Sequence, residues 1–465
     1  MNKVKTPWLW VPTLYFAEGI PYFIVNVISV TMFKRLGMGN AALAAYTSML
    51  YLPWVIKPLW GPLVDIVRSK RWWILAMQAV MTVAFALLAL SVPHISTLLA
   101  VTLILFYITA FASATHDIAA DGYYMIALDA HRQSLFVGIR STFYRIASVF
   151  GQGVIVVLAG VLETRLGDIP RAWELTLLLC SALFALVTVY HWFALPRPES
   201  AGVAERPEGA ADQAVGCKTG APAPGELEKP AVGCKTGDPA PGTPEKRPAP
   251  GARATLRSFG QVFADFFRKP QVGIAILFML LYRLPEALSV KMLSPFLLDP
   301  VGEGGLGLST VDSGLVYGTV GVIALTAGGI LGGLFAARHG LKRSLWPMAL
   351  SLALPCAVYL YMSLAQPEQI WQVYLCVAFD QFGYGFGFTA YLLYMMYFSE
   401  GPSKTAHYAL CTAFMALSMM VPGLFAGLLQ EALGYTGFFI LVMVCCLVTV
   451  GVTFLIKVDP EYGKK

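Results

Sequence analysis

Twelve long apolar segments, in two sets of six separated by a polar stretch, constrain the fold of this chain more than any other feature. The first set lies at residues 7–33, 41–63, 73–92, 97–128, 135–162 and 172–195, and the second at 271–297, 311–337, 344–364, 370–399, 405–432 and 435–457. A helix needs about 20 apolar residues to cross ~30 Å of hydrocarbon. Only helices and closed barrels satisfy their own backbone there. The pattern therefore predicts an all-α membrane protein with twelve transmembrane helices in two six-helix bundles.

Composition supports a membrane environment. Of 465 residues, 57% are hydrophobic and 13% charged, and the mean hydropathy is +0.65, which is unusual for a water-soluble protein. The first segment starts within ten residues of Met1, carries Glu18 in its middle and lacks a small-residue cleavage site. It is expected to be a retained helix rather than a signal peptide.

The basic residues of the short loops predict the orientation. One set falls on a single side of the predicted membrane: Lys3, Lys5, Arg68, Lys70, Arg71, Arg132, Arg338, Lys342, Arg343, Lys404, Lys457, Lys464 and Lys465. The opposite loops 93–96, 299–310 and 365–369 contain no Lys or Arg, although Lys34, Arg35, Arg165 and Arg171 depart from the pattern. Because cytoplasmic loops are enriched in positive charge, we expect a multi-pass membrane protein with both termini in the cytoplasm.

The polar stretch at 196–253 is rich in Pro, Gly and Ala and contains a near-duplicate, AVGCKTGAPAPG from Ala214 and AVGCKTGDPAPG from Ala231. Such a composition cannot bury a core. It predicts a disordered cytoplasmic linker between an N-terminal bundle at 1–195 and a C-terminal part at 254–465, with a regulatory or partner-binding loop as the alternative.

Apolar residues recur at helical spacing directly after the linker, among basic residues. They are Leu256, Phe259, Phe263 and Phe266. This pattern predicts an interfacial helix on the inner leaflet, preceding the second bundle.

Several function classes receive no support from the sequence. The eight cysteines fall within predicted spans or in the linker, without metal-ligand spacing, and neither HExxH nor GxSxG occurs. We expect no enzyme activity, no metal and no cofactor. The net charge of +6 reflects the basic loops rather than a nucleic-acid site. The expected partners are a small-molecule substrate, protons and the lipid bilayer, and the chain is expected to be a monomer.

Two loops at equivalent positions of the two halves share a motif. The first runs from Gly61 to Asp65 and continues with Arg68, Lys70 and Arg71, and the second runs from Gly333 to Arg343. The pair resembles the repeated G-x-L-a-D-r-x-G-R-R loop of the major facilitator superfamily, although Ala337 replaces the Asp in the second copy, and Ile66 and Arg68 occupy the r and G positions of the first. The alternative is a plain basic turn. The resemblance implies conformational gating by Lys57, Gly61, Asp65, Arg68, Arg71, Arg338, Gly340 and Arg343.

A more specific resemblance covers nearly the whole chain outside the linker. Its segments are residues 52–65, 113–121, 282–287, 295–297, 380–387 and 405–410. These segments resemble the signatures of AmpG-type muropeptide permeases. The resemblance implies proton-coupled import of cell-wall-derived anhydro-muropeptides or amino sugars across the cell inner membrane. Glu18 is not the common pattern, and His116 and His407 stand where that family usually has Gln. These departures leave a siderophore or acyl-CoA carrier of the same fold open. A non-transporting sensor or scaffold, indicated only by Ala337 in place of the motif's Asp, also stays open.

Ionisable residues inside the predicted spans are the candidate site, because a charge at the bilayer centre costs at least ~3 kcal/mol. Glu18 shares a helix face with Tyr15, Tyr22 and Asn26. Such a polar stripe predicts a cavity lining. A local ion pair or a protonated Glu18 that only fixes packing is the alternative.

Asp117 and Asp121 are four residues apart on one helix face. Two close carboxylates favour proton binding by one of them. We therefore predict proton coupling through Asp117, Asp121 and Glu18, with Asp117 the better candidate because it lies nearer the membrane middle. Neutralisation of both by Lys57, Arg140 or Arg145 would instead make them structural.

Arg140 and Arg145 point about 140° apart around their helix, with Tyr144 on the side of Arg140. One is expected to pair with the fourth helix and the other to bind a substrate carboxylate through its guanidinium fork; the sequence does not decide which. Arg283 and Glu286 are spaced to pair with each other, with Lys291 further toward the outer face. That pair is either self-contained or part of a gate.

Asp380, Tyr384 and Tyr391 form a further polar stripe, interleaved with glycines that permit close helix approach. Its tyrosines could stack on sugars or pack within the bundle, and His116 and His407 could titrate near neutrality or be packing residues. The predicted substrate-binding set is Tyr15, Glu18, Tyr22, Asn26, His116, Arg140, Tyr144, Arg145, Arg283, Glu286, Asp380, Tyr384, Tyr391 and His407.

Overall fold

The computed structural model describes residues 6–128, 130–197, 252–401, 403–460 and 462. Side chains are not described at 65, 66, 130, 131, 134, 137 and 252–259. Most of the predicted linker, at 198–251, thus lies outside the described residues.

The N-terminal half contains six spans, several of which are interrupted by short non-α segments. In chain order its elements are η1 (Pro7–Leu9), α1 (Val11–Phe23), η2 (Ile24–Ile28), α2 (Ser29–Arg35), α3 (Asn40–Met49), α4 (Leu52–Val67), α5 (Lys70–Ser91), η3 (Val92–His94), α6 (Ile95–Ala127), α7 (Ala130–Val149), η4 (Phe150–Ile155), α8 (Val156–Leu166) and α9 (Ile169–Ala194). The segments η2 and η4 are π-helical, so the first and fifth spans each continue as one helix through these segments.

The C-terminal half repeats this layout after one additional helix. Its elements are α10 (Ala252–Phe267), α11 (Val272–Leu281), α12 (Leu284–Leu298), η6 (Val301–Glu303), α13 (Thr310–Ser313), the π-helical η7 (Gly314–Gly321), α14 (Val322–His339), α15 (Leu341–Ala353), η8 (Leu354–Cys356), α16 (Ala357–Ala365), α17 (Ile370–Phe398) and α18 (Lys404–Leu455).

The number of spans agrees with the sequence prediction. Eight helical stretches are long and apolar enough to cross a membrane, and two of them, Lys70–Ala127 and Lys404–Leu455, each contain a reversal and count twice. The second reversal is at Gly434, whose φ of 69° suits a residue without a Cβ. The α3–α4 pair and α17 supply the other two spans. Twelve spanning helices within the described chain confirm the predicted fold class.

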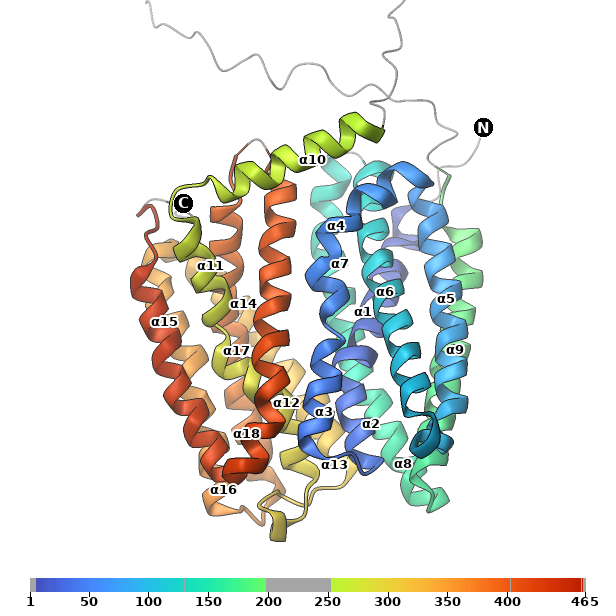
Figure 1. Cartoon of the computed structure of the whole chain (residues 1–465), viewed down its shortest axis with the longest axis vertical. Helices are drawn as coiled ribbons and strands as arrows, with labels where there is room; N and C mark the ends of the chain where they lie inside the picture. Colours follow the sequence, from blue (N-terminus) through green and yellow to red (C-terminus); the bar gives the residue numbers. More distant parts are fainter. Residues whose placement is uncertain (1–5, 129, 198–251, 402, 461, 463–465) are drawn as a thin grey trace, which may run out of the picture.

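Figure 1 shows the two halves side by side, with α1 to α9 in blue to green and α11 to α18 in yellow to red. The described chain begins and ends at the same end of the molecule, where α10 lies across the helix ends. We call this the linker end. Phe266 anchors α10 there, because its buried ring packs against Phe398, His407 and Phe414.

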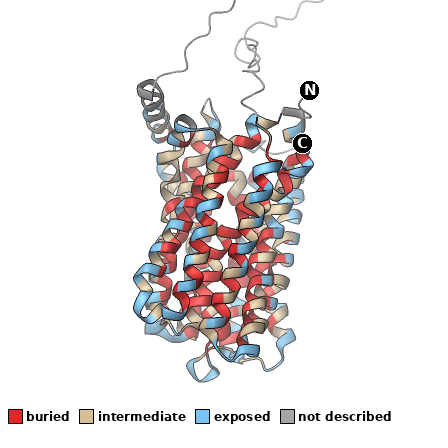
Figure 2. Cartoon of the chain, turned by 90° about the vertical axis from the view of Figure 1, so that its right-hand side faces the viewer, coloured by how far each residue is buried: buried red, intermediate tan, exposed pale blue. Residues whose placement is uncertain are grey.

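Burial follows the pattern expected in a lipid bilayer. Buried residues line the inside of the helix bundles, and exposed ones lie on the outer surface (Figure 2). That surface carries many large apolar side chains, such as Leu186, Phe193 and Phe454, which are 69%, 67% and 72% exposed. Hydrocarbon solvates such side chains, whereas water would favour their burial.

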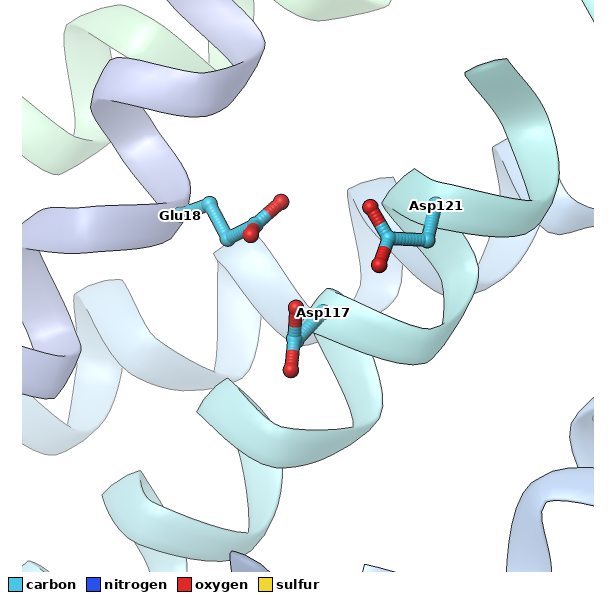
Figure 3. A group of neighbouring side chains, drawn as sticks. All are labelled: Glu18, Asp117 and Asp121. Carbon is cyan, nitrogen blue, oxygen red and sulfur yellow. The ribbon is translucent and has the colours of Figure 1, made fainter. Parts of the chain in front are cut away.

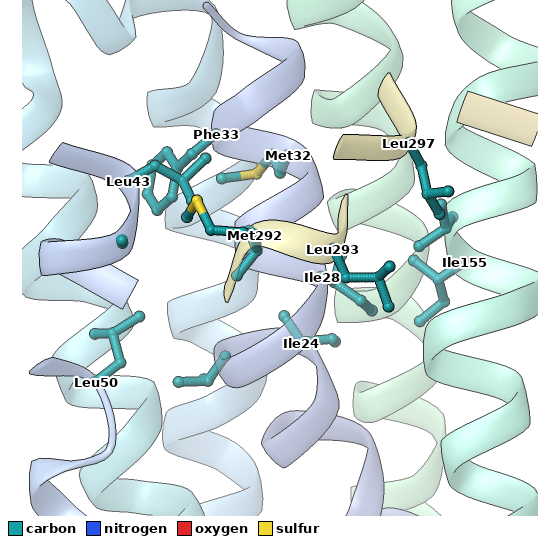
Figure 4. Packing of buried hydrophobic residues seen from close by; sticks show 14 of the residues in the cluster. Ile24, Ile28, Met32, Phe33, Leu43, Leu50, Ile155, Met292, Leu293 and Leu297 are labelled. Atoms are coloured by element: carbon teal, nitrogen blue, oxygen red, sulfur yellow. The ribbon is translucent and has the colours of Figure 1, made fainter. Parts of the chain in front are cut away.

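The two bundles contact each other closely toward the end opposite the linker. Met292, Leu293 and Leu297 of α12 lie among apolar residues of the N-terminal half, including Ile28 and Ile155 (Figure 4). Glycine allows the backbones to approach. A Cβ on Gly427 would lie 1.9 Å from the carbonyl oxygen of Asn40, and one on Gly318 would lie 2.0 Å from that of Gln152.

Polar contacts reinforce this closure on two sides. Lys34 forms an ion pair with Asp299 at 2.5 Å. The Asn40 amide donates to Gln430 at 2.7 Å. On the other side, Thr310 donates to Glu163 at 2.7 Å. The structure therefore represents a conformation that is closed at the end opposite the linker.

Candidate proton and substrate site

Three carboxylates from two helices converge in the N-terminal bundle. Asp117 and Asp121 lie one turn apart on α6, and Glu18 projects toward them from α1 (Figure 3). One oxygen of each carboxylate lies within 4.8 Å of one oxygen of the other two. The predicted proton-coupling residues are thus brought together, and Coulomb repulsion among them requires cations or protons nearby.

Two basic side chains from two further helices form ion pairs with two of the three carboxylates. Lys57 of α4 forms an ion pair with Asp117. Arg140 of α7 binds Asp121 at 2.7 Å. Its guanidinium also lies 4.5 Å from the centre of the Tyr15 ring, and the Tyr15 hydroxyl donates to Asp121 at 3.1 Å.

Glu18 is the carboxylate without a cation. Its side chain is 7% exposed, and its Oε2 atom is buried without a hydrogen-bond partner. With every group ionised, three carboxylates and two cations carry a net charge of −1. Ionised Glu18 loses hydration, is repelled by Asp117 and Asp121 and forms no ion pair of its own, although Arg140 attracts it from a longer range. A bound proton on Glu18 is therefore favoured.

The cluster faces the space between the bundles. The side chains of Lys57, Asp121 and Arg140 are 25%, 35% and 32% exposed, whereas Glu18 lies behind them. Tyr408 of α18, in the other half, interacts electrostatically with Arg140 and Asp121. Water that enters between the bundles can therefore reach the cluster.

Arg145 differs from Arg140 in having no carboxylate partner within the described part of the chain. It is exposed on α7, and its guanidinium lies 3.3 Å from the position that a Cβ on Gly329 of α14 would occupy. The two arginines therefore separate as the sequence predicts. Arg140 pairs with the fourth span, and Arg145 lies at the bundle interface with its donors available to a ligand. Tyr144 packs against Phe23 at 5.8 Å between ring centres.

The C-terminal half presents a self-contained ion pair. Arg283 lies where the seventh span breaks between α11 and α12, and it binds both oxygens of Glu286, at 2.7 and 2.8 Å. It also donates to the Tyr384 hydroxyl at 2.9 Å. Tyr22 of α1 interacts electrostatically with Arg283 and Glu286 as well as with Asp117. Tyr22 thus lies between the cluster and the pair.

Comparison with known proteins identifies the architecture. Residues 13–408 match the profile of the Major Facilitator Superfamily. The chain belongs to this superfamily. It is a secondary transporter of the two-bundle type, and superfamily members place their substrate between the bundles.

Individual relatives cover most of the chain. The Anhydromuropeptide permease of Escherichia coli (strain K12) is 24% identical over 434 residues, which are 92% of this chain and 75% of that protein. This match confirms the resemblance to AmpG-type permeases. Two solved structures share the fold: the D-xylose-proton symporter, with a TM-score of 0.69, 11% identity and coverage of 98% and 99%, and the nucleoside transporter NupG, with 0.66, 16% and 98% of both chains.

Within this superfamily fold, the residues of the predicted stripe of Asp380, Tyr384 and Tyr391 have different surroundings. Tyr391 is fully buried and donates to the carbonyl of Met279 at 2.7 Å. Asp380 accepts from Tyr359 at 2.6 Å and from Gln381 at 3.0 Å, and it lines a cavity of about 30 Å³ inside the C-terminal bundle. Both tyrosines contact Arg283: the Tyr384 hydroxyl accepts a hydrogen bond from it, and the Arg283 guanidinium lies 5.9 Å from the centre of the Tyr391 ring.

The two histidines also have structural surroundings. His116 is buried and bonds to Gln78, which in turn bonds to His191. His407 bonds to the carbonyl of Val262 in α10. These contacts favour the packing alternative over substrate binding for both histidines. Asn26, by contrast, lines a second cavity of about 30 Å³, and this one lies between the bundles.

The loop motifs of the superfamily are only partly described. The side chain of Asp65 lies outside the described residues. Arg71 donates to the carbonyls of Leu195 and Trp192, at 3.2 and 2.6 Å, and so holds the end of α9 within its own bundle. Arg68, Arg338 and Arg343 are exposed, Gly61 has open space around it, and Gly340 provides a turn with φ 78°. Lys57, which was predicted to take part in gating, belongs to the carboxylate cluster through its ion pair with Asp117.

The closure residues at the opposite end were not predicted. A usable signal was present, because Lys34, Arg35 and Arg171 are basic residues at the end opposite most of the other basic loops. Each has a carboxylate partner. Lys34 pairs with Asp299, Arg35 with Glu163 at 2.9 Å and Arg171 with Glu174 at 2.5 Å.

Proposed function

We propose that this chain imports anhydro-muropeptides into the cytoplasm with protons, and that Glu18 carries the coupled proton. The linker end then faces the cytoplasm, as the basic loops indicate, and the closed end faces outward. The substrate class is taken from the Escherichia coli relative, which is named a permease for anhydromuropeptides. The observation that carries the proton assignment is the uncompensated, buried carboxylate of Glu18.

Glu18 is a better proton site than Asp117. Lys57 already neutralises Asp117, and an ion pair of this kind stabilises the ionised carboxylate. A proton on Glu18 brings the cluster to neutrality and leaves both ion pairs intact. Loss of that proton to the cytoplasm restores the net negative charge and favours rearrangement of the cluster.

Arg145 is the proposed anchor for an acidic substrate. Peptide and lactyl groups of muropeptides carry carboxylates, and a guanidinium can donate two parallel hydrogen bonds to a carboxylate. Tyr22 and Tyr384, which lie between the cluster and the Arg283 pair, are the proposed contacts to the sugar and peptide. The proposed substrate site and the carboxylate cluster then both face the space between the bundles.

During transport, the two ends of the molecule open and close in turn. Contacts such as Lys34–Asp299 and Thr310–Glu163 hold the outer end shut in this conformation. Rocking of the bundles would break them and close the linker end instead. Proton and substrate drive import only through their different affinities for the two states.

The deciding experiment measures uptake of labelled anhydro-muropeptide into proteoliposomes with an acidic exterior. We expect the native protein to concentrate the ligand. Glu18→Gln should abolish concentration and retain exchange of ligand across the membrane, because the neutral amide mimics a permanently protonated Glu18. Glu303→Gln, on an exposed loop, is the matched control and should transport normally.

Two outcomes would contradict the proposal. Concentrative uptake by Glu18→Gln would remove Glu18 as the proton site. Binding of the ligand without any uptake by the native protein would indicate a sensor or scaffold. A parallel binding screen with siderophores and acyl-CoAs would reveal a different substrate class if either competes better than the muropeptide.

A further inference from the structure

Lys291 is a fully buried lysine that the proposed proton site does not use. It lies on α12 with no solvent exposure, at the contact between the bundles toward the outer end. Its Nζ atom donates to the Thr47 hydroxyl of α3 at 3.2 Å and lies 5.0 Å from the centre of the Tyr51 ring. No carboxylate pairs with Lys291 in the described part of the chain.

On a further neighbouring helix, α18, a glycine leaves space for the Lys291 side chain. A Cβ on Gly423 of α18 would lie 3.3 Å from Lys291 Cγ and 2.4 Å from Ser48 Oγ. The Ser48 hydroxyl is itself buried without a hydrogen-bond partner. Within the described chain, Lys291 has no carboxylate partner and the Ser48 hydroxyl has no hydrogen-bond partner. The two side chains lie together at an interface that must open during transport.

The charged groups of the surrounding elements already have partners of their own. On α12, Glu286 binds Arg283, and at its end Asp299 binds Lys34 of α2. The other charged side chains of these elements toward this end are bound as follows: Arg35 of α2 to Glu163, the Asp312 carboxylate of α13 to the Ser309 hydroxyl, and Glu431 of α18 to the backbone N–H of Ala41 in α3. Lys404, at the start of α18, lies at the linker end. Tyr51 is the titratable group that contacts Lys291 directly.

Desolvation decides the state of Lys291 in this conformation. An isolated ammonium group taken out of water loses far more than one hydroxyl and one aromatic ring return, so a buried lysine sheds its proton instead. The neutral amine is compatible with its bond to Thr47. Separation of the bundles at the outer end would break that contact and admit water, and the lysine would then bind a proton.

We propose that Lys291 is a proton-binding site that is available only when the outer end is open, and that it must release its proton before that end can close. This inference rests on the proposed orientation and on alternation between two states. A proton that binds only the open state raises the ratio of open to closed protein as external pH falls. The ratio changes by up to tenfold per pH unit for one proton.

A cysteine reporter can measure this ratio. Ser294 lies one turn beyond Lys291 and bonds across the interface to Thr31 at 2.9 Å. In Ser294→Cys, a membrane-impermeant maleimide added outside should react only when the outer end opens. Rates are normalised to those of the unfolded protein at each pH, and protein without the reporter gives the background from native cysteines.

We expect labelling to rise as external pH falls from about 8 to about 6, by up to tenfold per unit. Adding Lys291→Met should lower labelling and lessen its pH dependence, since methionine fills the site without a proton. Lys291→Arg should keep labelling high throughout, because a guanidinium does not shed its proton. Lys34→Met is the matched control. It weakens the outer ion pair, so it should raise labelling and retain the native pH dependence.

An unchanged pH dependence in Lys291→Met would overturn the proposal, and so would low labelling in Lys291→Arg. If the arginine variant does not fold, the methionine variant decides alone. Labelling needs neither muropeptide nor uptake. A labelling result that contradicts the role of Lys291 would therefore not contradict the proposed import of muropeptide. Absent uptake together with the expected labelling profile would contradict import and still support the proton site at Lys291.

Discussion

The charged groups of the two halves are organised in opposite ways. In the N-terminal half, α1, α4, α6 and α7 each contribute to one cluster around Asp117 and Asp121, in which every ion pair joins two helices. In the C-terminal half, Arg283 pairs with Glu286 three residues along the same stretch. The first arrangement depends on how four helices are placed, whereas the ion pair of the second lies within one short stretch at the start of α12 and contacts α17 through Tyr384.

This difference indicates a division of labour between two halves of the same fold. A cluster shared by four helices couples its charge state to helix positions, so a proton on Glu18 can alter packing. A local ion pair provides a fixed polar wall. The proposed coupling therefore resides mainly in the N-terminal half, and the C-terminal half contributes substrate contacts and the lysine at the outer closure.

Loss of Lys57 is expected to have the largest effect among substitutions that test this comparison. In Lys57→Met, Asp117 loses its counter-ion, so the cluster holds one uncompensated carboxylate when Glu18 is protonated and two when Glu18 is ionised. Removing one partner of a buried pair costs about 3–5 kcal/mol, and the low end applies because the Lys57 side chain is 25% exposed. Thermal unfolding of the purified protein should show the loss, and concentrative uptake should disappear.

The rescue variant distinguishes charge from packing. Lys57→Met combined with Asp117→Asn removes both charges and should recover most of the thermal stability. If the double variant is as unstable as the single one, the lysine stem rather than its charge matters, and the cluster is not the electrostatic unit described above.

Arg145 tests whether the N-terminal half also holds the acidic end of the substrate. We expect Arg145→Ala to weaken binding of a muropeptide with a free peptide carboxylate by about 10- to 100-fold, since a charged hydrogen bond contributes about 1.5–3 kcal/mol. The same ligand with its carboxylates amidated should bind both proteins alike. Calorimetry on purified protein measures both affinities, and an equal loss for the two ligands would argue against a carboxylate contact.

The sequence predicted the architecture because spans follow from length and apolarity, which depend little on tertiary contacts. Glu18, Asp117 and Asp121 could be singled out because their placement in lipid requires a local reason. Which carboxylate lacks a cation could not be predicted, because the answer depends on Lys57 of α4 and Arg140 of α7 arriving from distant parts of the chain. The sequence therefore favoured Asp117, whereas the ion pairs favour Glu18.

Helix faces were the least predictable feature. Tyr391 and His116 lie in the same spans as Tyr384 and Asp117, yet both point into their own bundles and bond to Met279 and Gln78. When apolar residues surround a helix on all sides, periodicity carries little information about which side faces a cavity. The closure contacts were missed for a related reason, because they join residues far apart in the chain, such as Lys34 and Asp299.

Exchanging arginine for lysine in each half gives the smallest and most direct comparison. Arg283→Lys keeps the charge beside Glu286 and loses the second parallel hydrogen bond and the stacking on Phe388, whose ring centre lies 4.7 Å away. We expect a loss of about 1 kcal/mol in stability and a few-fold slower uptake. Arg140→Lys should slow uptake more, because Arg140 joins α7 to α6 through Asp121. Uptake rates of the two variants are compared at matched protein amounts. If Arg283→Lys slows transport as much as Arg140→Lys, the C-terminal pair also rearranges during transport, and the contrast between the two halves is wrong.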